Sequence, residues 1–166
     1  MTVLGIDPGL ERVGWAVVEK SGSALRAVEY GLIKTPRTAL QERLNQIHAD
    51  VGDLIQRFSP DCLATERLFF TKNQTTAMDV AKALGVVLLT ASQNDLPCYE
   101  YSPPEVKLSV VGNGSAEKKQ VQYMVVRLLS LKEDPKPDDV ADALAVAVTH
   151  ALRVSTASPE PAPSPR

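Results

Sequence analysis

The stretch Val3-Leu4-Gly5-Ile6-Asp7-Pro8-Gly9 decides how this chain is organised. Its apolar residues predict a strand that runs through the core, and the Pro-Gly pair predicts a turn directly after it. Asp7 stands where the strand ends. Because a carboxylate is rarely buried unless it is paired or bound to a metal ion, a core strand that ends in Asp indicates a functional site.

Further acidic residues occupy similar positions. Glu66 ends the apolar run of residues 62–65, and Asp139 and Asp142 open an apolar segment near the C-terminus. A three-residue spacing places Asp139 and Asp142 on one face of a helix. If the two strands are neighbours and the helix crosses them, the four carboxylates converge. Such hard oxygen ligands suit two Mg²⁺ ions, or Mn²⁺, which would activate a water molecule for phosphodiester hydrolysis.

Each acidic residue also has an ordinary structural interpretation. Asp7 could cap the Pro-Gly turn, and Glu66 could pair with a neighbouring basic residue. Asp139 would lie in the first turn of its helix, where the helix dipole favours an acid. We expect Asp138 to be the N-cap of that helix, and His150 to be a helix cap or a surface residue.

The composition is that of an ordinary globular protein, and the 166 residues predict one domain. No apolar run approaches the ~20 residues of a membrane span, and no secretory signal is visible. We therefore expect a cytoplasmic protein with no membrane partner. Cys62 and Cys98 lie in apolar, strand-like contexts and are interpreted as buried free thiols.

The net charge of −2 hides an uneven distribution. When the four candidate carboxylates and Asp138 are set aside, 18 basic residues face 15 acidic ones. The remainder of the chain is thus mildly basic if metal ions neutralise the acidic cluster. Composition therefore permits a DNA partner without arguing for one.

Hydrophobic periodicity predicts alternating strands and helices. The predicted strands cover residues 2–7, 12–19, 25–34, 62–66 and 98–101. The predicted helices cover residues 38–58, 73–92, 103–111, 115–131 and 137–153. In the second helix, the expected inner face is formed by Ala77, Val80, Ala81, Leu84 and Leu88. This order predicts an α/β fold, a mixed sheet flanked by helices on both faces, followed by a disordered Pro-rich tail over residues 154–166.

Several short motifs occur along the chain in a characteristic order. In sequence they are Gly5-Ile6-Asp7-Pro8-Gly9, Glu66 with Phe69 and Lys72-Asn73, Lys107, the run from Val111 to Lys118, and the run from Asp139 to Ala145. Together they resemble the RuvC family of bacterial Holliday-junction resolvases, in the RNase H-like superfamily. The resemblance covers about residues 2–152. No single motif is specific, but their order and spacing are.

The resemblance implies an RNase H-like nuclease domain over residues 1–153, with a five-stranded mixed sheet. It implies a crossover junction endodeoxyribonuclease that acts in DNA recombination and repair. The enzyme would be a homodimer whose two sites nick opposite strands of a four-way junction symmetrically. RuvA and RuvB, which migrate junctions, are implied as partners. We expect the second helix to form the dimer face.

The resemblance also implies roles for single residues. The catalytic and metal-binding set is Asp7, Glu66, Asp139 and Asp142, where spacing favours Asp139 over Asp138 as the first helical ligand. The implied DNA-binding residues are Phe69, Phe70, Lys72, Lys107, Lys118 and Lys119. Without the resemblance, the adjacent lysines at a helix start could bind phosphate or form a solvated face. The paired phenylalanines could stack on bases or pack in the core.

Three other functions stay open at this stage. The first motif also resembles the phosphate motif of actin-like kinases and ATPases, which need a second Gly-rich loop that we do not find. A non-catalytic binding module would not need four intact carboxylates. An RNA-directed nuclease of the same superfamily is not excluded by the carboxylates. Lys107, Phe69 and the run 112–118 favour the junction resolvase.

Overall fold

A computed structural model describes residues 1–68 and 74–154 of the chain. The strands are β1 (Thr2–Asp7), β2 (Arg12–Ser21), β3 (Ala24–Lys34), β4 (Cys62–Glu66) and β5 (Cys98–Tyr101). The helices are α1 (Leu40–Phe58), α2 (Gln74–Gln93), α3 (Pro103–Val111), α4 (Lys118–Leu128) and α5 (Asp138–Arg153). The five strands form one mixed sheet in the order β3-β2-β1-β4-β5, which confirms the predicted fold class.

Strand β1 lies at the centre of the sheet. It pairs antiparallel with β2 and parallel with β4, and the register sets Gly14 opposite Asp7. Ile6 is paired with Thr65 in the parallel ladder, so Asp7 and Glu66, the next residues of the two strands, lie side by side. Both are at the C-terminal ends of their strands, and this end of the sheet is called its edge below. The two strand-end carboxylates are therefore neighbours, as the sequence predicts.

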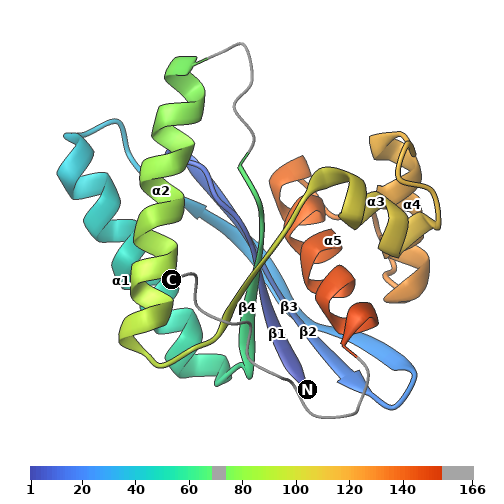
Figure 1. Ribbon diagram of the computed structural model, residues 1–166. Coiled ribbons are helices and arrows are strands. Elements are labelled where there is room, and N and C mark those ends of the chain that lie inside the picture. Colours follow the sequence, from blue (N-terminus) through green and yellow to red (C-terminus); the bar gives the residue numbers. More distant parts are fainter. Residues whose placement is uncertain (69–73, 155–166) are drawn as a thin grey trace, which may run out of the picture.

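Helices cover both faces of the sheet (Figure 1). Successive residues of a strand point to opposite faces, so Leu4 and Ile6 pack in one core with α1 and α2. Val3, on the other face, packs in a second core with α3, α4 and α5. The edge of the sheet that carries Asp7 is thus flanked by helices from two separate layers.

Helix α5 lies directly on the backbone of β1 and β2. A Cβ atom added to Gly14 would overlap the carbonyl oxygen of Asp139, and one added to Gly5 would overlap that of Ala143. Most of α5 is buried, including Leu144 with no exposed surface. The two glycines therefore let the helix approach closely enough to bring its first turn beside the end of β1.

Two helices differ from their predicted form. Helix α4 is shorter than the predicted 115–131 because the Gln120 side chain accepts a hydrogen bond from the Glu117 N–H at 2.8 Å and fixes the first turn there. Near its other end, Ser130 is left-handed with φ of +50°. In α2 the predicted inner face is only partly right. Leu84 is buried as predicted, but Ala81 is exposed, and the other residues that are buried between 77 and 93 are Ala83, Val87, Thr90 and Ala91.

Two side chains also contradict their expected burial. His150 is only 2% exposed, and its Nδ1 is 2.7 Å from the Tyr101 hydroxyl, so it is neither a cap nor a surface residue. Cys62 is buried as expected, but Cys98 is exposed. The predicted tail lies, beyond Val154, outside the described residues and stays a prediction. Across the described parts of the chain, no helix has the length and apolar character that crossing a bilayer requires.

Candidate active site

Asp7 lies at the centre of the acidic cluster. Its pKa is raised to about 8, first by burial and then by the negative charges of Asp142, Asp139 and Glu66, in that order. The fold therefore brings the three other predicted carboxylates close enough to Asp7 for their charges to act on it. Burial is also the main cause that raises the pKa of Glu66, with Asp142 as the next contribution.

Lys118 is held between two acidic residues of α5. Its Nζ atom lies 2.7 Å from Oδ2 of Asp142 and 3.2 Å from Oδ2 of Asp138. Burial disfavours the lysine charge, but these two hydrogen-bonded carboxylates outweigh burial and raise the pKa of Lys118. Burial raises the pKa of Asp142, and the hydrogen bond from Lys118 opposes that shift.

Asp138 is not the N-cap that we expected. The N-cap position belongs to Pro137, and Asp138 is the first helical residue. Its carboxylate faces α4 instead, where it contacts Lys118 and accepts a hydrogen bond from Gln122 at 3.3 Å. The hydrogen bond from Lys118 is the main cause that lowers the pKa of Asp138. Asp138 therefore helps to position a lysine at the edge of the cluster.

Arg12 is a charged neighbour of the cluster that sequence reasoning did not single out. Its Nη2 atom lies 3.5 Å from Oδ2 of Asp139, and its side chain is 54% exposed. One signal was available, because β2 starts at the sheet edge where β1 ends. The second strand of a hairpin begins near the residue that ends the first strand, which here is Asp7.

The donor set fits a divalent cation. Four carboxylates offer hard oxygen ligands, and a cation would relieve the repulsion that raises the pKa of Asp7. Among residues 1–68 and 74–154, no three Asp, Glu, His or Cys side chains are already close enough to enclose an ion. Lys118 and Arg12 instead contact the outer carboxylates Asp142 and Asp139.

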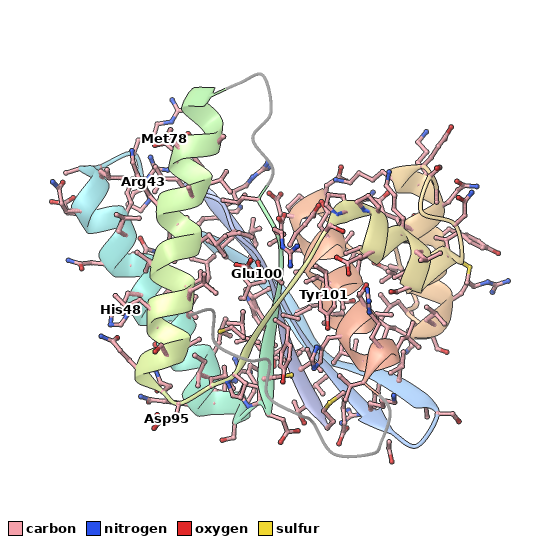
Figure 2. The ribbon with its side chains drawn as sticks, viewed as in Figure 1. Arg43, His48, Met78, Asp95, Glu100 and Tyr101 are labelled. Carbon is pink, nitrogen blue, oxygen red and sulfur yellow. The ribbon has the colours of Figure 1, made fainter. Side chains whose placement is uncertain are left out.

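Two open clefts adjoin the cluster from opposite layers of the fold. One, of about 320 Å³, is lined by residues of β4, α3, α4 and α5 that include Glu66, Lys107, Lys118 and Asp142. The other, of about 410 Å³, is lined by residues of the β1–β2 turn, β2, α1, α2 and α5 that include Arg12, Arg43 and Asp139. Arg43 comes from α1 and lies towards the Met78 end of α2 (Figure 2).

The predicted DNA-binding residues divide into three groups. Lys107 and Lys118 line the first cleft beside Glu66. Lys119 lines a different cleft, of about 350 Å³, with Tyr123 and Asp138. The remaining three lie outside the described residues: Phe69, Phe70 and Lys72.

Comparison with known proteins gives consistent matches. The family model described as "Crossover junction endodeoxyribonuclease RuvC" matches residues 3–150. A curated protein of that name from Halothermothrix orenii is 51% identical over 151 residues, covering 90% of this chain and 92% of the relative. Another from Brevibacillus brevis is 52% identical over 152 residues, covering 91% of this chain and 92% of the relative.

A solved structure agrees with the sequence matches. Thermus thermophilus RuvC in complex with Holliday junction substrate is 42% identical and superposes with a TM-score of 0.87. The alignment covers 92% of this chain and 93% of that chain. A protein solved with a junction substrate thus shares the fold over most of both chains.

Proposed function

This chain belongs to the RuvC family of crossover junction endodeoxyribonucleases, and we propose that it resolves four-way DNA junctions during recombination and repair. The observation that carries the proposal is the gathering of Asp7, Glu66, Asp139 and Asp142 at one edge of the sheet. A relative solved with a Holliday junction substrate supports the choice of substrate. Symmetric nicking of opposite strands is the reaction that we propose.

We further propose that the four carboxylates hold two Mg²⁺ ions, for which Mn²⁺ could substitute. Nucleases of this family are metal-dependent. When bound, two such ions would supply an activated water and stabilise the leaving oxygen of the phosphodiester. Asp7, the acid whose pKa is raised by all three others, is the natural shared ligand.

The basic residues would bind and orient the DNA. Lys107 and Lys118 line the cleft that also holds Glu66 and Asp142, so a phosphate at the acidic cluster would lie within their reach. Lys118 would then exchange its carboxylate contacts for phosphate oxygens. Contacts from Lys119, Phe69, Phe70 and Lys72 are proposed from the family resemblance.

Symmetric cutting needs two active sites, and we propose a homodimer. Helix α2 supports this, because Met78 and Leu89 are each 56% exposed on it although both are large and apolar. An 11-residue separation places them on one side of the helix. RuvA and RuvB as partners, a cytoplasmic location, and the division into a domain of residues 1–153 and a tail are proposed from the sequence.

The test compares three substrates: a synthetic four-way junction, a linear duplex of matched sequence and an RNA–DNA hybrid. We expect paired symmetric nicks in the junction alone, only with Mg²⁺ or Mn²⁺. Asp7→Asn should abolish cleavage while junction binding persists, and Asp53→Asn, at an exposed position on α1, should cut normally. Full cleavage by Asp7→Asn would refute the metal site, and preferential cutting of the hybrid would refute the substrate.

A further inference from the structure

We propose that the cleft lined by Arg12 and Arg43 binds a phosphodiester of the cut strand, next to the phosphodiester that lies over Asp7. The inference rests on the proposed function and adds a subsite to it. Among the described residues, the DNA-binding residues implied by the sequence motifs are lysines of α3 and α4. Arg12 and Arg43 lie on the other side of the carboxylates, near α1 and α2.

The position of the cleft follows from the two layers of the fold. Lys107 and Lys118 line a cleft that α3, α4 and α5 help to form, whereas Arg12 and Arg43 line one that includes α1 and α2. Figure 1 shows α1 and α2 on one face of the sheet and α3, α4 and α5 on the other. The carboxylates lie at the sheet edge between them. A DNA strand that crosses the carboxylates continues on both sides, so its backbone meets the lysine cleft in one direction and the arginine cleft in the other.

Arg12 is suited to contact a phosphate. Its side chain is more than half exposed, and its 3.5 Å contact to Asp139 is a long one. A guanidinium binds phosphate oxygens through paired N–H groups. If Asp139 binds a metal ion, its negative charge no longer balances the guanidinium of Arg12. That guanidinium is then available to bind an anion.

Arg43 adds a fixed positive charge to the same cleft. Its Nε donates to Oγ1 of Thr35 at 2.9 Å, and that hydroxyl donates to the carbonyl oxygen of Leu10 at 2.6 Å. Its Nη2 is buried without a hydrogen-bond partner, and within the described residues no carboxylate lies within 4.0 Å of the guanidinium. Within the described residues, Arg43 is therefore not held in an ion pair.

Two other acidic residues line the cleft, and neither cancels these charges. Asp79 is 3.1 Å from Nζ of Lys82 and is paired outside the cleft. Glu11 is exposed at the rim. With Asp139 engaged by metal, two guanidinium groups face one solvated carboxylate, which favours an anionic ligand over a cationic one.

The test measures how junction binding depends on salt. The wild-type chain serves as the parent, so that all four carboxylates stay in place, and fluorescence anisotropy follows binding of a labelled four-way junction at saturating Ca²⁺ in place of Mg²⁺, with a gel to confirm that no strand is cut. Arg12→Gln should weaken binding roughly five- to tenfold near 0.1 M salt and lower the slope of log K against log salt by about 1, as expected for one lost phosphate contact. Arg12→Lys should retain most of the slope.

The matched control is Arg26→Gln. Arg26 is 66% exposed and also pairs with a carboxylate, that of Glu19 at 2.6 Å, but it lies on β3 outside the cleft. Because replacing Arg43 would also break its bond to Thr35, the exposed Arg12 carries the test. An unchanged slope for Arg12→Gln, or an equal change for Arg26→Gln, would overturn the arginine subsite while junction binding by the parent upholds the proposed function. A parent that does not prefer the junction over duplex would overturn both.

Discussion

Lys118 and Lys119 are adjacent in sequence but have different surroundings. Lys118 contacts Asp142 and Asp138, whereas Lys119 lines another cleft. We therefore expect Lys118→Gln to slow junction cleavage about 100-fold, the typical loss of a charge that acts on the reacting group. Lys119→Gln should weaken DNA binding modestly and leave the single-turnover rate at saturation almost unchanged. Equal effects of the two substitutions on that rate would contradict the assignment.

His150 makes the fold sensitive to acid. Burial lowers its pKa to about 4, with the positive charge of Lys20 acting in the same direction. Its unfolded pKa is near 6.5, so the unfolded chain binds more protons between these values, and stability that is complete above pH 6.5 is lost as the pH falls towards 4. The loss from pH 7 to pH 5 should be about 2 kcal/mol.

Urea unfolding of the wild type and of His150→Gln at both pH values checks this. The comparison is needed because burial raises the pKa of Asp7, Glu66 and Asp142, which acts in the opposite direction. Since those groups are common to both proteins, their contributions cancel. Between pH 7 and pH 5, the free energy of unfolding of the variant should fall by about 2 kcal/mol less than that of the wild type. Parallel pH dependences would show that His150 does not titrate as stated.

Residues with local signals were predictable, and residues defined by distant contacts were not. Asp7 and Glu66 stand at the ends of apolar runs, so their position at the sheet edge can be read from the sequence. The roles of Asp138 and Arg12 depend on partners in other elements, and the partner of Asp138, Lys118, is 20 positions away in the chain. His150 is buried because Tyr99 and Tyr101 of β5 cover it, which periodicity does not reveal.

At the scale of elements, the contact between α5 and the sheet sets the spacing of the carboxylates. Gly14 is opposite Asp7 in the ladder and touches the backbone of Asp139. Gly14→Ala must therefore displace the start of α5 from β1. A misplacement of about 1 Å can cost roughly 100-fold in rate, so we expect a loss of that order in cleavage with junction binding largely kept.

Gly52→Ala is the matched control for that change. A Cβ at Gly52, inside α1, would meet only Thr90, at an ordinary 3.9 Å. This substitution should leave cleavage unchanged and stabilise the fold by about 0.5–1 kcal/mol. Cleavage rates and urea unfolding of both variants test the idea, and normal cleavage by a folded Gly14→Ala variant would contradict it.

The elements themselves were largely predictable, because strand alternation and helical periodicity are strong along most of the chain. The orientation of α2 was not. Val86, Val87, Leu88 and Leu89 are consecutive apolar residues, so several stripes around the helix satisfy the same pattern. Only packing against α1 and the sheet selects the stripe that includes Val87, and it leaves Leu89 exposed.

At the scale of the whole molecule, one end of the sheet gathers the carboxylates, and each helical layer contributes a cleft beside it whose lining includes two basic side chains. The sequence predicted the edge, the α/β architecture and the lysine side. The arginine side was not predicted because the β1–β2 turn, α1 and α2 meet only in the folded chain. A strand of DNA laid across this edge would be held on both sides of the bond that is cut.

The most direct test of the account is to locate Mn²⁺ in crystals of the full chain by anomalous diffraction. We predict anomalous peaks within metal–oxygen distance of Asp7 and its neighbouring carboxylates Glu66, Asp139 and Asp142, with the Lys118 contact to Asp142 broken. The unsoaked crystal should keep that contact. Mn²⁺ bound elsewhere, with no peak at Asp7 and Lys118 still hydrogen-bonded to Asp142, would contradict the account.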